Sequence, residues 1–214
     1  MGSERHRAPN AGQFETIDRA NPEFGRLTMY TVGYFVGSLA EHSINRVLSR
    51  ALIREAPRDL VFVEIPIKDL PLYNRDRDAD YPSECRALKE RIAAVDAVLF
   101  VTPEYSRGIP GSLKNAIDWG SGPWGNNSFA LKPSAVIGAS SDKMGTAAAQ
   151  QSLRNIMSHC HSAQMNVPEV FVHFTLGLIT DDGEVTDDKV RQLLTHFMSE
   201  FRNFIARALT GASA

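Results

Sequence analysis

The most informative part of the sequence is residues 99–119, LFVTPEYSRGIPGSLKNAIDW. Its first residues continue an apolar run from Ala97 that is typical of a buried strand. Pro103, Gly108 and Pro110 then prevent a regular ladder until a helix can begin after Pro110. The sequence predicts a strand over 97–102, a tight loop and a helix over 111–119. In an open parallel sheet, such a loop lies at the carboxyl end of a strand, where these folds bind ligands.

Strands and helices alternate through the rest of the chain. Apolar runs predict further strands over 28–36, 60–65, 133–139 and 170–174. Apolar residues at helical spacing follow each strand, and the last such helix has an apolar stripe from Val190 to Ile205. This alternation implies a parallel sheet covered on both faces, with right-handed crossovers. We therefore expect a three-layer αβα sandwich, an α/β fold with a five-stranded parallel sheet of order 2-1-3-4-5.

Composition narrows the classes of function. The chain has 214 residues and a net charge of −2, so no basic field favours nucleic acid as a partner. Residues 1–26 are polar and predict a flexible N-terminal arm, followed by one domain over 27–210. No secretory or membrane-spanning stretch occurs, and Cys85 and Cys160 have no metal-ligand or disulfide spacing. We expect a cytoplasmic protein without membrane contact, in which both cysteines are reduced.

Three loops are candidates for one binding site. Residues 37–46 combine Gly37, Ser38 and Ser43 with a helix start, which suits a phosphate group, although Ser43 could simply cap the helix. Residues 102–106 offer outward backbone N–H groups beside Tyr105, where a flat heteroaromatic ring could rest. Residues 139–146 are small and polar, and alone could be a helix cap. In a sheet of order 2-1-3-4-5 the ends of strands 1, 3 and 4 converge, so the loops are expected to form one site.

Two other patterns are set aside. Residues 120–125 satisfy G-x-G-x-x-G, but they follow a helix rather than a strand, so they are not expected to bind a dinucleotide. His159 and His161 are two residues apart on a predicted helix and point in different directions, so no metal site is expected.

With these residues in view, the sequence resembles the NADPH-dependent FMN reductase family, a flavodoxin-like group that includes bacterial quinone, chromate and azo-dye reductases. The likeness spans about residues 28–208. Its most specific part is TPEYS…IPGSLKNAIDW, close to the family pattern T-P-E-Y-N…I-P-G-x-L-K-N-A-I-D-W. Weaker support comes from residues 37–46, similar to G-S-L-R-x-x-S-x-N-R, and from LPLYN at 70–74, similar to L-P-x-Y-N.

The resemblance implies a reaction and a set of site residues. A bound FMN would accept a hydride from NADPH or NADH and pass the electrons to a quinone-like or other electron-poor small molecule. Tyr105 is the candidate catalytic residue, and with residues 66–82 it would wall the acceptor pocket. A homodimer or homotetramer is expected, with Trp119 and Trp124 as candidate interface residues, although burial in the core would explain both as well. The implied cofactor-binding residues are Ser38, Ser43, Ile44, Asn45, Pro103, Glu104, Tyr105, Ser106, Ser140 and Ser141.

The chain also departs from the family pattern. Ala40 stands where the family has a phosphate-loop arginine, and Glu41 follows it. Losing a charge-assisted phosphate contact costs about 1.5–3 kcal/mol, so FMN would be held more loosely unless Arg46 substitutes. Ser106 replaces the family's asparagine. These departures keep an alternative open, namely a flavodoxin-like FMN-binding protein with weak or no reductase activity, either an electron carrier or a degenerate member of the family.

Overall fold

The central sheet is parallel throughout, and a computed structural model describes it within residues 28–211. The expected arm over 1–26 lies outside the described residues. The strands run in the order β2-β1-β3-β4-β5, as predicted, and β6 also pairs with β4. Their bounds are β1 Tyr30–Val36, β2 Leu60–Glu64, β3 Ala97–Val101, β4 Pro133–Ser140, β5 Ala163–Gln164 and β6 Phe171–His173.

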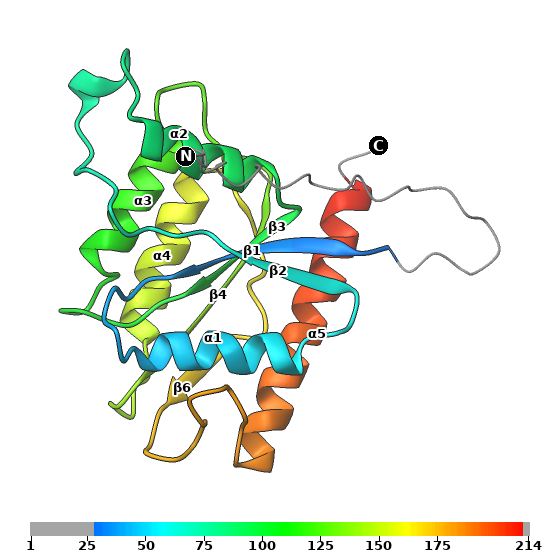
Figure 1. The fold of residues 1–214 in the computed structure, drawn as a ribbon. Helices are drawn as coiled ribbons and strands as arrows, with labels where there is room; N and C mark the ends of the chain where they lie inside the picture. Colours follow the sequence, from blue (N-terminus) through cyan, green and yellow to red (C-terminus); the bar gives the residue numbers. More distant parts are fainter. Residues whose placement is uncertain (1–27, 212–214) are drawn as a thin grey trace, which may run out of the picture.

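Helices cover both faces of this sheet, as the alternating sequence pattern requires (Figure 1). Helices α1 (Ile44–Glu55) and α5 (Asp188–Gly211) pack on one face. Helices α2 (Ser83–Ala93), α3 (Gly111–Ser121) and α4 (Ala147–His159) pack on the other. All five residues of β3 are buried because this strand has neighbours on both sides and helices on both faces. The three-layer αβα sandwich is therefore confirmed.

The far edge of the sheet differs from the prediction of one strand over 170–174. The two-residue strand β5 pairs with the beginning of β4 at Pro133 and Ser134, and β6 pairs with its end from Gly138 to Ser140. Two short strands thus share one side of β4. The sequence does not reveal β5, because residues 160–164, CHSAQ, contain no apolar run.

Two further predictions concern the G-x-G-x-x-G pattern and the two cysteines. Gly120 and Ser121 are the last residues of α3, so no strand precedes the G-x-G-x-x-G pattern and the dinucleotide fingerprint is absent there. Both cysteines are buried and free. Within residues 28–211, none of the helices combines the length and apolar character needed to cross a membrane.

Candidate functional site

The loops after β1, β3 and β4 lie at the same edge of the sheet, because parallel strands end together. The Gly37 N–H donates to the carbonyl of Val101 at 2.9 Å, and Ser112 Oγ donates to the Gly37 carbonyl at 3.1 Å. A Cβ atom at Gly37 would lie 3.2 Å from both Thr102 Oγ1 and Pro103 Cδ. Glycine therefore allows the first loop to pack directly against the second.

The first loop ends in a helix start that can receive an anion. Ser43 is the N-cap of α1, and its Oγ accepts a long hydrogen bond from the Arg46 N–H at 3.4 Å. The N–H groups of Ile44 and Asn45 have no acceptor among the described residues. Because unpaired N–H groups and the helix dipole both favour negative charge, this turn suits a phosphate group.

The Asn45 side chain holds the first loop to β4. Its Nδ2 donates to the Ala139 carbonyl, and its Oδ1 accepts from the Ala139 N–H, both at 2.9 Å. The side chain is buried, so both halves of its amide are used within the protein. Asn45 therefore positions the turn at the beginning of α1, and its backbone N–H is the group left to bind a ligand.

Ser38 and Tyr105 connect the first and second loops. Their hydroxyl oxygens lie 3.2 Å apart, and Ser38 Oγ also accepts from the Ala40 N–H at 3.2 Å. Ser38 is buried, whereas Tyr105 is 51% exposed. The tyrosine ring thus stands at the surface while its hydroxyl reaches the predicted phosphate loop.

The second loop contains a tight two-residue turn. Tyr105 and Gly108 exchange two backbone hydrogen bonds, each of 3.0 Å. Between them, Ser106 and Arg107 have φ angles of 50° and 65°, which is the left-handed geometry of a type I′ turn. Serine tolerates this conformation less well than the asparagine of the family pattern. The departure at Ser106 therefore affects the stability of the turn.

Glu104 connects the second and third loops. Its Oε2 accepts from the N–H groups of Ala148 and Ala149, at 2.9 and 3.1 Å, at the beginning of α4. Its Oε1 lies 3.7 Å from Nη1 of Arg107. The carboxylate satisfies two unpaired helix donors and faces the positive end of the helix dipole. The Glu104 side chain is thus a structural connection, and its backbone remains available to a ring.

A hollow of about 230 Å³ lies between the second and third loops. Ser140 lines it, and Ser140 Oγ accepts from the Asp142 N–H at 3.1 Å, which leaves the hydroxyl proton free to donate. Ser141 is exposed and does not line the hollow. The lining residues are Glu104, Ser106, Arg107, Ser140, Asp142, Met144 and Gly145.

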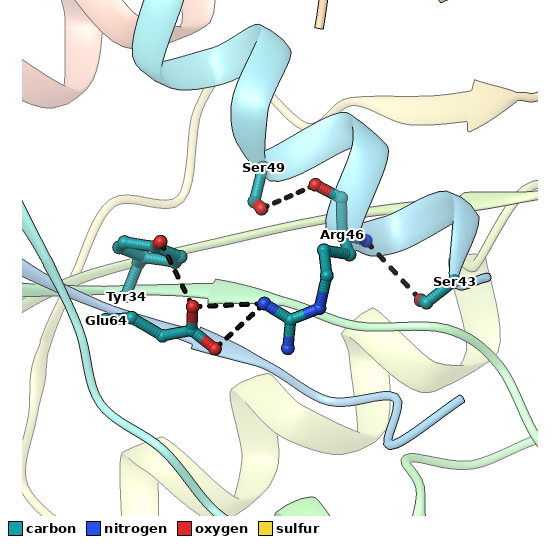
Figure 2. A network of polar contacts seen from close by, with 5 residues as sticks. All are labelled: Tyr34, Ser43, Arg46, Ser49 and Glu64. Atoms are coloured by element: carbon teal, nitrogen blue, oxygen red, sulfur yellow. Dashed lines mark hydrogen bonds and ion pairs between the residues drawn. The ribbon is translucent and has the colours of Figure 1, made fainter. Parts of the chain in front are cut away.

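Arg46, the cation that could have replaced a phosphate-loop arginine, forms an ion pair elsewhere (Figure 2). Its Nη1 donates to both carboxylate oxygens of Glu64 at 3.0 Å, and the Tyr34 hydroxyl donates to Glu64 Oε2 at 3.3 Å. Burial and the Glu64 charge raise the pKa of Tyr34, so its hydroxyl remains a donor. The α1 turn therefore presents neutral donors to a phosphate.

Asn115 and Trp119 of α3 hold the neighbouring loop, whereas the sequence suggested only an interface role, for Trp119. Trp119 Nε1 and Asn115 Nδ2 both donate to the Pro71 carbonyl, at 2.7 and 3.0 Å. Asn115 Oδ1 accepts from the Tyr73 N–H at 2.8 Å. Their spacing of four residues, which places both on one helix face, was the available signal. Trp119 is fully buried and cannot form a subunit contact at the surface, whereas Trp124 is 98% exposed.

The residues present fit an FMN molecule. Free N–H groups and the Ser38 and Ser43 hydroxyls suit its phosphate, and the second loop offers backbone groups beside an aromatic side chain. The fold defines a flavodoxin-like protein, and the three loops meet at the switch point of its sheet.

Comparison with known proteins identifies the family. The NADPH-dependent FMN reductase model matches residues 30–177, and the chain belongs to this family. A 2-hydroxy-1,4-benzoquinone reductase from Burkholderia is 40% identical over 174 residues, which cover 81% of this chain and 95% of the relative. A quinone reductase from Pseudomonas putida is 39% identical over 178 residues, covering 83% and 95%.

Solved structures agree with this assignment. The flavoenzyme NAD(P)H:(acceptor) oxidoreductase FerB from Paracoccus denitrificans is 42% identical, with a TM-score of 0.81, covering 84% of this chain and 99% of that one. A flavodoxin from Pseudomonas aeruginosa is 17% identical, with a TM-score of 0.50, and shares the fold. The family, the flavodoxin-like fold and the class of flavin-dependent oxidoreductase expected from the sequence are thus confirmed, as is a family association with FMN and NAD(P)H.

Proposed function

We propose that the chain is an NAD(P)H-dependent FMN oxidoreductase that reduces a quinone or a similar electron-poor small molecule. The observation that carries this proposal is the meeting of three loops, held together by Asn45, Glu104 and Ser38, around unpaired helix donors. The names of the relatives, quinone reductases in two genera of bacteria, support a quinone as acceptor. In the overall reaction, NAD(P)H, a proton and a quinone give NAD(P)⁺ and a hydroquinone.

Bound FMN would supply the two-electron relay in this reaction. The protein groups would bind and orient it. The N–H groups of Ile44 and Asn45, with the Ser38 and Ser43 hydroxyls, would hold the phosphate. The loop from Pro103 to Ser106 would hold the ring through its backbone, and Ser140 would donate its hydroxyl proton at the neighbouring hollow. Ser141, which is exposed beside that hollow, would contact the cofactor only at its rim.

Tyr105 would wall the acceptor pocket together with the loop that Asn115 and Trp119 hold in place. The acceptor would take its protons from solvent or from exposed hydroxyls. We expect specificity for flat acceptors to depend on the Tyr105 ring.

The test is an anaerobic stopped-flow titration of FMN-loaded protein with NADPH or NADH, followed by benzoquinone. Bleaching of the flavin absorbance by the nucleotide and its return with quinone are expected. Tyr105→Ala should change the rate of flavin reoxidation by several quinones. The rate of flavin reduction by NAD(P)H should stay within twofold of the wild type, and the thermal unfolding midpoint within a few degrees. Absence of bleaching by either nucleotide would contradict the proposal.

A second candidate is a flavin-binding protein with weak or no reductase activity. It is favoured by Ala40, Glu41 and the engagement of Arg46 with Glu64, which together leave the phosphate turn without a cationic side chain from these positions. It predicts weak FMN binding by fluorescence quenching and no turnover of NAD(P)H. A flavin-loaded protein that turns over quinone rejects it.

Location and assembly are part of the proposal. Two buried, unpaired thiols are consistent with a reducing compartment, and we propose the cytoplasm. We also propose a homodimer or homotetramer, with the exposed Trp124 in the contact, which light scattering of the wild type and of Trp124→Ser would test.

A further inference from the structure

A groove lies beside the proposed flavin site, between α1 and the hairpin that follows β6. We call it the α1 groove, and its volume is about 360 Å³. One wall is the face of α1 that carries two arginines at a spacing of four residues, and the other wall is largely apolar. The wall residues used below are Arg46, Val47 and Arg50 from α1, and Phe174, Leu176 and Ile179 from the hairpin.

The hairpin is fixed against α1, so the groove is preformed. Ile179 and Val185 form an antiparallel bridge, and the Thr180 N–H donates to the Glu184 carbonyl at 2.9 Å. Gly183 has a φ angle of +91°, and a Cβ atom there would lie 2.7 Å from the backbone carbonyl carbon of Arg50. The backbone of the hairpin thus packs directly on the helix, where only glycine fits.

The α1 groove is continuous with the proposed flavin site. Ser43 and Ile44, at the phosphate turn, also line the groove. The Phe174 N–H donates to the carbonyl of Ser140 at 2.8 Å, which joins the beginning of the hairpin to the third loop. A long ligand with one end over the flavin ring can therefore place its other end in the groove.

Arginine donors face this groove. Arg50 is exposed and uses Nη1 on the Asp181 carbonyl at 2.5 Å, which leaves its other guanidinium groups without an acceptor in the described chain. Arg46 is oriented and largely neutralised by Glu64, as Figure 2 shows. Glu41 and Asp181 bring two acidic side chains to the groove, and Arg50 is the lining arginine that pairs with no carboxylate among the described residues. Guanidinium groups bind phosphate through paired N–H donors.

The opposite wall suits a flat base. Phe174 is half-buried and Leu176 is fully exposed, although both are large apolar side chains. Apolar side chains can cover the face of an aromatic ring, and the free donors of the neighbouring Arg50 guanidinium can bind a phosphate attached to that ring system.

We propose that the α1 groove binds the adenosine end of NADPH, with Arg50 on the 2′-phosphate and with Phe174 and Leu176 against the adenine. This inference rests on the proposed function, because the nicotinamide end must reach the flavin. A phosphate that pairs with an arginine gains charge-assisted hydrogen bonds that NADH lacks. The enzyme therefore prefers NADPH to NADH by about ten- to hundredfold in kcat/KM.

The first experiment measures binding without flavin or turnover. Isothermal calorimetry compares adenosine 2′,5′-bisphosphate with 5′-AMP on the full-length wild type, on Arg50→Gln and on Arg54→Gln. Arg54 is the matched control: it lies one turn further along α1, forms an exposed ion pair with Asp182 at 3.4 Å, and does not line the groove. The bisphosphate should bind at least tenfold more tightly to the wild type and to Arg54→Gln. Arg50→Gln should reduce this preference to threefold or less.

The second experiment is the ratio of kcat/KM for NADPH over NADH with FMN-loaded protein, which should fall at least tenfold in Arg50→Gln. Equal affinity of the wild type for the two nucleotides, or the same preference in Arg50→Gln as in the wild type, overturns the inference. If calorimetry gives the expected pattern but neither nucleotide is oxidised, the groove is supported and the proposed oxidoreductase function is rejected.

Discussion

Replacing Glu104 tests whether the candidate site is held together by one carboxylate. Its Oε2 accepts two N–H groups of α4, at 2.9 and 3.1 Å, and the side chain is 12% exposed. A hydrogen bond to a charged group contributes about 1.5–3 kcal/mol, but these two bonds share one oxygen, and water can reach a helix end. We therefore expect Glu104→Ala to lower the free energy of unfolding by about 2–3 kcal/mol.

The isosteric variant separates the hydrogen bonds from the charge. Glu104→Gln keeps an oxygen that can accept both N–H groups and loses the charge that faces the helix dipole, worth about 0.5–1 kcal/mol. We expect a loss of about 1 kcal/mol. The nearby Arg107 is 78% exposed, so its ion pair with Glu104 should contribute less than about 0.5 kcal/mol, which Arg107→Gln checks.

Urea denaturation followed by circular dichroism measures the free energy of unfolding of all three variants. Hydrogen exchange measures the protection of the Ala148 and Ala149 amides. Glu104→Ala should abolish that protection locally and weaken FMN binding, because the third loop loses its connection to the second. If Glu104→Ala and Glu104→Gln destabilise the protein equally, or if Glu104→Ala costs less than about 0.5 kcal/mol, the assigned role of the carboxylate is wrong.

Three further predictions follow from other contacts. Asn45→Ala leaves the buried N–H and carbonyl of Ala139 unpaired, and should cost about 2–4 kcal/mol in the same denaturation assay. Ser106→Asn places a residue that adopts positive φ more readily at a φ angle of 50°, and should raise the free energy of unfolding by about 0.5–1 kcal/mol. A decrease would contradict the inference that Ser106 is strained. Burial raises the pKa of Cys85 from 9.0 to about 11. Between these values the unfolded chain loses a proton that the folded chain keeps, so stability should fall by about 2–3 kcal/mol as pH rises, and by less in Cys85→Ala.

The fold was predictable because each element satisfies a local rule as well as a global one. Residues 97–101 are apolar without interruption, which suits only a strand buried on both faces, and the structure gives β3 those bounds. The strand over 163–164 was not predictable, since two residues carry no periodicity and their pairing with β4 depends on the path of the whole chain. The local sequence pattern thus predicts the central strands, whereas the short edge strand depends on tertiary pairing.

The candidate site was predictable as a set of loops but not as a set of contacts. The strand order predicts that the loops with Ser38, Asn45 and Glu104 lie at one edge of the sheet. It could not show that the side chains of Asn45 and Glu104 bind the neighbouring loops, since that depends on distances between residues 94 and 44 positions apart. Both side chains are engaged with neighbouring loops, so we propose that Asn45 and Glu104 contribute to the site through their backbone groups.

Arg46 shows most clearly that the sequence does not reveal where a side chain points. The spacing of the first loop placed a cation within three residues of Ser43, and nothing local indicated where its guanidinium would point. The structure pairs it with Glu64 on the neighbouring strand, and Tyr34 completes the group (Figure 2). Because a carboxylate at 3.0 Å offsets most of the arginine charge, the helix start would hold a phosphate with backbone N–H and hydroxyl groups. The charge that remains on this face of α1 is that of Arg50, one turn further along the helix. The groups that would hold the flavin phosphate and the group that would select the nucleotide are therefore different residues.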